Sequence, residues 1–114
     1  MKTEYNPQHA FINSTHAPAA NTAAVVTLAA RAGERRVVTQ IDYSLAGTVA
    51  AAALLSVTGL DESNYNVTLP IAVQSGQLFF QMEPLRGLVN TAVVVTLATG
   101  GASATGIINV IHDP

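Results

Sequence analysis

The sequence lacks cysteine and tryptophan, and charged residues make up only 11% of its 114 residues. The absence of cysteine excludes disulfides and thiolate metal sites. An average soluble domain carries about 25% charged residues. This chain therefore has few surface charges to prevent association with other proteins. Half of its residues are hydrophobic, mostly alanine and valine, with few aromatics. This composition indicates a surface that partners cover, through oligomerisation or assembly.

Basic runs and long apolar segments are also missing. The five cations, Lys2, Arg31, Arg35, Arg36 and Arg86, form no long run. The chain therefore lacks the pattern of a surface that follows nucleic-acid phosphates. The longest apolar stretch, residues 45–57, is too short to span a bilayer as a helix, and no signal-peptide pattern opens the sequence. We expect neither a nucleic-acid partner nor a membrane partner.

Motifs of catalysis and cofactor binding are absent as well. The three histidines, His9, His16 and His112, lack the spacing of zinc ligands, and we expect them on the surface or in the N-terminal segment. Asp61 and Glu62 do not fit a calcium loop. No serine lies in a Gly-x-Ser-x-Gly turn, and the glycine-rich stretch at 99–106 has no lysine to hold a phosphate. We expect no enzymatic activity, no cofactor and no metal.

What the sequence does contain is a series of short β-branched segments separated by turn residues. From residue 23 onward, about seven or eight such segments follow one another without a convincing helical period. The alanine-rich stretch 50–55 is compatible with a helical turn, but the β-branched and turn-forming residues that follow it favour a strand. Residues 35–46 alternate, with Val37, Thr39, Ile41 and Tyr43 expected on one face and Val38, Gln40, Asp42 and Ser44 on the other. The pattern predicts an all-β, single-domain antiparallel β-sandwich over residues 23–114.

Residues 1–22 differ from the rest, with two prolines and no clear period, and we expect an extended N-terminal arm. The arm contains Tyr5, Phe11 and Ile12, which an unattached tail would not need. They either pack back on their own domain or anchor the arm on a neighbouring subunit. Arg86, in a tight loop, either binds local carbonyl and carboxylate groups or contacts a partner. These four residues are the candidate interface residues.

One ten-residue segment occurs twice in the sequence in nearly the same form. "NTAAVVTLAA" at 21–30 and "NTAVVVTLAT" at 90–99 agree at eight of ten positions. Each copy would present a Val–Leu face to the core and a Val–Thr face that tolerates water. We expect both copies to be scaffold strands in equivalent places of a two-sheet sandwich, and the distance between them is too long for a solenoid repeat.

The stretch from "NTAAVVTLAARAGERRVVTQIDYSLAGTVAAAALLSVT" to "PLRGLVNTAVVVTLATGGASATGIINVI" resembles small bacteriophage virion proteins of the head-decoration or cement kind. The resemblance covers about residues 23–111. It implies a jelly-roll-like sandwich and a homotrimer on the outer surface of a phage head, assembled in the host cytoplasm. It also implies that the partner is the major capsid protein and that the trimer stabilises the contacts between capsid subunits. The alternative is a carbohydrate- or receptor-binding sandwich of a virion or cell surface, such as a fibre or tail component. Such a module would usually show exposed aromatic platforms, and only three tyrosines and no tryptophan are available here.

Overall fold

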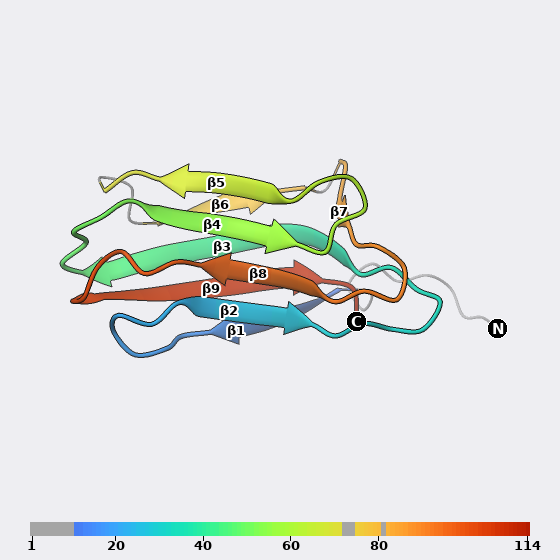
Figure 1. Ribbon diagram of the computed structural model, residues 1–114, viewed down its shortest axis with the longest axis horizontal. Helices are drawn as coiled ribbons and strands as arrows, with labels where there is room; N and C mark the ends of the chain where they lie inside the picture. Colours follow the sequence, from blue (N-terminus) through green and yellow to red (C-terminus); the bar gives the residue numbers. More distant parts are fainter. Residues whose placement is uncertain (1–10, 72–74, 81) are drawn as a thin grey trace.

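The computed structural model describes residues 11–71, 75–80 and 82–114. Two antiparallel sheets lie face to face (Figure 1). Sheet A has the strand order β1–β9–β3–β6, with β7 also paired to β3, and sheet B has the order β2–β8–β4–β5. The strands are β1 (Ile12–His16), β2 (Ala24–Leu28), β3 (Val37–Gly47), β4 (Ala53–Thr58), β5 (Tyr65–Leu69), β6 (Ser75–Phe79), β7 (Leu85–Arg86), β8 (Val93–Leu97) and β9 (Ala104–His112). Within the described ranges, no helix is long and apolar enough to cross a bilayer.

The strand pairs are nested along the chain. β1 pairs with β9, β2 with β8, β3 with β6 and β4 with β5, all antiparallel. The chain therefore runs as one long hairpin that is rolled over into two sheets, which is the wrapping of a jelly roll. The predicted all-β sandwich is confirmed, with the two-residue β7 added at the edge of sheet A.

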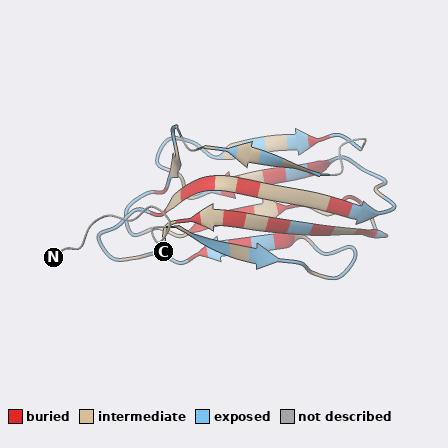
Figure 2. Ribbon diagram, turned by 180° about the vertical axis from the view of Figure 1, so that it is seen from behind, coloured by how far each residue is buried: buried red, intermediate tan, exposed pale blue. Residues whose placement is uncertain are grey.

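The core lies between the two sheets, where the alternating pattern of the strands places their apolar side chains. In β4, Ala53, Leu55 and Val57 are fully buried while Leu54 is 44% exposed. This strand also confirms the β interpretation of the alanine-rich stretch. Both copies of the repeated segment are scaffold strands, β2 and β8, and they lie side by side in sheet B. The core residues are Ala24, Val26, Leu28, Val38, Ile41, Leu45, Ala53, Leu55, Val57, Leu69, Val93, Val95, Leu97, Ala104, Ile108 and Val110 (Figure 2).

The predicted faces of β3 are wrong at the start of the strand, around Val38. Val38 lies opposite His112, but Gln40 lies opposite Ile111, so the register shifts between them. This β-bulge lets Val38 and Ile41 both face the core, although they are three positions apart in the strand. Beyond the bulge the predicted alternation holds, with Ile41 buried and Asp42 on the outer face.

The N-terminal segment contributes a strand to the sandwich. Ile12–His16 pairs with β9 along its whole length, with Ile12 opposite His112 and His16 opposite Ile108. The described part of the sandwich therefore includes Ile12–His16, which the sequence pattern assigned to the arm. Residues 1–10 lie outside the described ranges.

Candidate functional site

Charge is confined to one end of the sandwich. Among the described residues, every charged side chain except Asp42 lies at the end where β2 leads into β3, β4 into β5 and β6 into β7. The opposite end has no charged residue in its described loops, which consist mainly of alanine, glycine, threonine and serine. Its loops are tied by backbone hydrogen bonds, as from the Ala50 and Ala51 N–H groups to the Gly100 carbonyl at 2.7 and 2.9 Å. The two ends therefore offer different chemistry to a partner.

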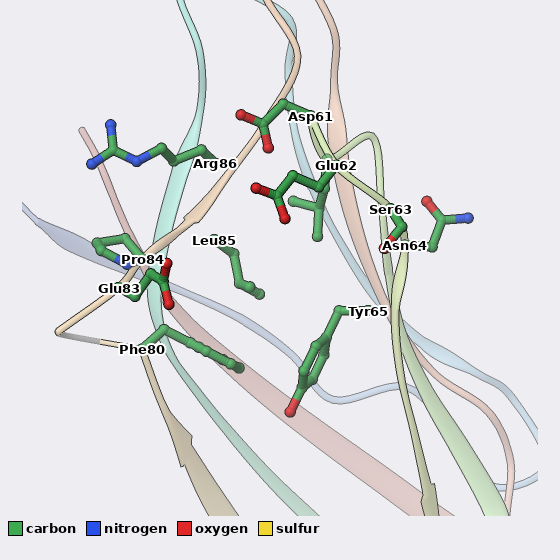
Figure 3. A pocket seen from close by; sticks show the side chains of 11 residues that line it. Asp61, Glu62, Ser63, Asn64, Tyr65, Phe80, Glu83, Pro84, Leu85 and Arg86 are labelled. Carbon is green, nitrogen blue, oxygen red and sulfur yellow. The ribbon is translucent and has the colours of Figure 1, made fainter.

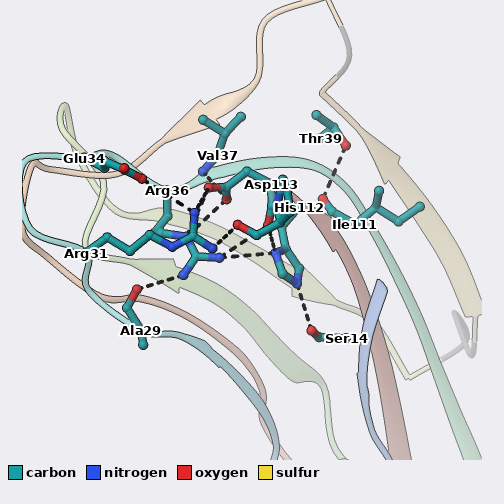
Figure 4. Close-up of polar contacts among 11 residues, drawn as sticks. Ser14, Ala29, Arg31, Glu34, Arg36, Val37, Thr39, Ile111, His112 and Asp113 are labelled. Atoms are coloured by element: carbon teal, nitrogen blue, oxygen red, sulfur yellow. Dashed lines mark hydrogen bonds and ion pairs between the residues drawn. The ribbon is translucent and has the colours of Figure 1, made fainter. Parts of the chain in front are cut away.

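Arg36 and Asp113 form the centre of the charged end (Figure 4). The Arg36 side chain is 6% exposed, and its Nε lies 3.2 Å from Asp113 Oδ1. Its Nη1 also donates to the Ala29 carbonyl at 2.8 Å. Asp113 accepts in addition from the Val37 N–H at 3.0 Å and pairs with Arg31 at 3.3 Å. A buried guanidinium with this many partners fixes the segment before β3 against the end of β9.

His112, expected on the surface, is instead 3% exposed, so that prediction is wrong. Its Nδ1 lies 2.5 Å from the Asp113 carbonyl oxygen, which can only accept, and its Nε2 lies 2.8 Å from Ser14 Oγ. Arg36 Nη2, which can only donate, lies farther from Nδ1, at 3.5 Å. The shorter contact with the Asp113 carbonyl therefore assigns the proton to Nδ1, and the Ser14 hydroxyl donates to Nε2. Burial lowers the pKa of His112, and the nearby Arg36 lowers it further against the opposing effect of the Asp113 carbonyl. The neutral imidazole thus helps to hold β1 on β9.

A pocket of about 380 Å³ opens at the same end. Its walls are the loop before β5 and the segment from Phe80 to β7, which are joined where the Asp61 N–H donates to the Arg86 carbonyl at 3.0 Å. The rings of Tyr65 and Phe80 meet edge to face, with centroids 5.2 Å apart. Figure 3 shows these rings at the base of the pocket. The site is an aromatic floor built from two distant parts of the chain.

The rim of this pocket is acidic. Asp61, Glu62 and Glu83 line it, and Figure 3 shows the Glu62 and Glu83 carboxyl groups directed into the space above the rings. Asp61 is ion-paired with Arg35 at 3.3 Å, whereas Glu62 and Glu83 form no ion pair with any described residue. Carboxylates above aromatic faces attract a cationic group more than a neutral one. The pocket therefore suits an ammonium or guanidinium group.

The outer face of sheet B is uncharged. None of its four strands contains Asp, Glu, Lys or Arg, and its edge strands β2 and β5 share this lack. Native edge strands are usually protected by charges, particularly lysine. The residues that point outward are Val25, Thr27, Leu54, Ser56, Thr58, Asn66, Thr68, Val94 and Thr96. A face without charged side chains suits close contact with another protein surface.

Asp42 lies on the outer face of sheet A and pairs with amides rather than with an arginine. Its Oδ1 accepts from Gln40 Nε2 at 2.8 Å and its Oδ2 from Asn109 Nδ2 at 3.4 Å. Asn109 Oδ1 accepts in turn from the Thr15 hydroxyl at 2.7 Å. This chain of polar side chains crosses β3, β9 and β1, and it includes a carboxylate on the outer face of sheet A, whereas the strands of sheet B carry no charged side chain.

The four candidate interface residues do not come together as one site. Tyr5 lies outside the described residues. Phe11 is half-buried beside the start of β1, and Ile12 is 46% exposed. Arg86 borders the acidic pocket on β7 with its guanidinium directed away from the cavity (Figure 3). Within the described ranges, that guanidinium makes no hydrogen bond or ion pair, so the prediction of local carbonyl or carboxylate partners finds no support there.

The sequence alone did not predict the acidic pocket, although it placed Asp61 and Glu62 in a turn and Tyr65 in the strand that follows. The missing signal is the bridge between Leu60 and Gly87, which brings the second wall alongside the first. In the described ranges, no group of three or more His, Asp or Glu side chains is placed to hold a metal ion.

No known protein family matches the sequence, and no curated protein is significantly similar to it. Solved structures give distant likenesses. The chain resembles part of a ruminal GH26 endo-β-1,4-mannanase (14% identity, TM-score 0.43), with 83% of this chain covering 18% of that one. It also resembles a de novo designed double-stranded β-helix (7% identity, TM-score 0.39, 88% and 97% covered) and the tomato aspermy virus structure (7% identity, TM-score 0.37, 100% and 82% covered). Likenesses at these TM-scores assign no role to this chain.

Proposed function

We propose that this protein is a structural virion protein, a cement or decoration protein that binds the outer surface of a phage head and stabilises contacts between major capsid subunits. The uncharged outer face of sheet B carries the proposal. An isolated soluble domain keeps charges on such a face and on its edges to prevent association. A face without them is suited to lie permanently against other proteins.

The sequence resemblance to phage decoration proteins also supports this role, and it implies that the partner is the capsid shell. The proposed working form is a homotrimer with no catalytic activity, located on the capsid surface. Its surface is divided so that the uncharged sheet and loops meet other protein surfaces, while the charged end is held together by its own ion pairs.

A pair of arginine substitutions tests the role of sheet B. Thr27 and Asn13 are both exposed strand residues, on the outer faces of sheets B and A respectively. We expect Thr27→Arg to reduce occupancy on particles stripped of the protein at least tenfold, because the guanidinium would be buried without a partner. Asn13→Arg is the matched control and should bind as the wild type does.

Circular dichroism and the melting temperature establish that both variants are folded. Equal occupancy of the two variants would contradict the assignment of sheet B as the contact surface. Failure of the wild-type protein to bind particles at all would contradict the virion role.

A further inference from the structure

We propose that the acidic pocket receives Lys2 from the N-terminal segment of a second copy of this chain. The occupant is residues 1–10, and the contact links one copy to the next. The inference rests on the self-association part of the proposed function and names the site that produces it.

Charge complementarity selects the occupant. Arg31, Arg35 and Arg36 each form an ion pair at the charged end. Glu62 and Glu83 face the pocket without such a partner among the described residues. Lys2 is the remaining cation apart from Arg86, which borders the pocket itself. An ammonium group above the rings of Tyr65 and Phe80 would gain both the carboxylates and the aromatic faces.

The position of residue 11 provides the reach. Ile12 lies opposite His112, so the described chain begins at the charged end, where the pocket also lies. Ten extended residues span roughly 33–36 Å. β1 and β6 are at opposite edges of sheet A, three strand spacings or about 14 Å apart. The segment is therefore long enough to reach the pocket of its own copy or that of a neighbour. Self-association, on which this inference rests, favours the pocket of a neighbour.

Exposed apolar side chains beside the pocket favour the same contact. Phe79 is 60% exposed, Met82 fully exposed, and Leu88 and Val89 are 44% and 41% exposed. All four belong to the stretch that also forms the second wall of the pocket. Tyr5, three residues after Lys2, brings an aromatic ring to this surface. Apolar patches of this kind mark protein contact sites more often than free surface.

The donor segment and the acceptor pocket are different surfaces, so the contact is heterologous. Such a contact forms a ring where the repeated rotation closes, and an open filament where it does not. The trimer of the proposed function corresponds to the closed case. A trimer requires three identical contacts of this type, one per copy.

Charge reversal in the full-length chain tests the inference, with sedimentation velocity as the readout. We expect Lys2→Glu alone, and Glu62→Lys with Glu83→Lys together, each to weaken self-association at least tenfold. One chain carrying all three changes should associate again. Glu34→Lys is the matched control, because it reverses a charge at the same end outside the pocket, and it should associate like the wild type.

A mixture of the Lys2→Glu chain with the Glu62→Lys/Glu83→Lys chain separates the two possible sources of the segment. Contacts between unlike chains should form again in the mixture, because each reversed segment or pocket finds its complement on the other chain. A ring of three copies has three contacts, and at most two of them can join unlike chains. We therefore expect partial recovery, with mixed dimers and weakened trimers. No recovery in the mixture, or unchanged association of Lys2→Glu alone, would overturn the inference. So would saturable binding of a neutral disaccharide in the pocket at unchanged association. Particle binding is measured separately, so loss of the virion role leaves this result distinct.

Discussion

Val26 of β2 lies directly opposite Val95 of β8, and the two valines occupy the same position in the repeated ten-residue segment. The two copies are thus related by a local two-fold axis through this pair. Leu28 consequently meets Val93, and Leu97 meets Ala24, so that a large residue faces a smaller one on each side. Packing between the edge strand β2 and its neighbour β8 therefore accounts for the repetition.

The repeat also includes the turn before each strand. Asn21 and Asn90 both have a positive φ, 59° and 61°, a conformation that asparagine tolerates better than most residues. Only Asn90 uses its side chain as well, accepting from the Gly33 N–H. We expect Asn21→Gly to leave the free energy of unfolding nearly unchanged and Asn90→Gly to lower it by about 1 kcal/mol. Urea denaturation of both variants checks this, and equal midpoints would contradict it.

Two adjacent leucines test the assignment of the core. Leu55 is fully buried and Leu54 is 44% exposed on the uncharged face. Leu55→Ala should lower the free energy of unfolding by about 2–5 kcal/mol, because it leaves a cavity between the sheets. Leu54→Ala should change it by less than about 0.5 kcal/mol. Thermal unfolding of both variants provides the comparison, and a similar loss in each would mean that the alternation of β4 is misassigned.

The Arg36–Asp113 pair should stabilise the fold far more than the exposed pair beside it. Asp113→Ala leaves the buried Arg36 guanidinium without its carboxylate and should cost about 3 kcal/mol. Glu34→Ala removes an exposed contact with Arg31 and should cost less than about 1 kcal/mol. Chemical denaturation at moderate salt measures both values. Similar small losses would show that Asp113 does not hold the end of β9.

The burial of His112 should make the fold less stable in acid. Its pKa is lowered in the folded protein, chiefly by burial, so below about pH 6.5 the unfolded chain binds this proton more readily than the folded one. Stability should therefore fall as the pH drops below that value, and level off once the pH passes the lowered pKa of the folded state. His112→Gln should reduce this pH dependence. Urea midpoints measured from pH 7.5 to pH 4.5 test it, and equal slopes in both proteins would contradict it.

The strands and the inward faces of β2, β4 and β8 could be predicted from the sequence, because each carries its own alternation of apolar residues. The segment at 12–16 could not, since "INSTH" has no apolar face and is held mainly by backbone pairing with β9. The bulge after Val38 and the burial of His112 also escape local reasoning. Both depend on strand partners more than sixty residues away.

The pocket has the same origin. Tyr65 and Phe80 meet only because the jelly-roll wrapping brings β5 and the end of β6 to neighbouring edges of the two sheets. Nothing in either local stretch predicts the other wall. Tertiary pairing therefore created the pocket, while the sequence pattern predicted the scaffold that carries it.

Electron cryomicroscopy of intact particles tests the virion role most directly. We expect trimers of this jelly roll on the outside of the head, with the uncharged face of sheet B against the major capsid protein. Particles lacking the protein should lose this density and regain it when the purified protein is added. A head surface without such density, or density found only on the tail or fibres, would contradict the assignment as a capsid cement protein.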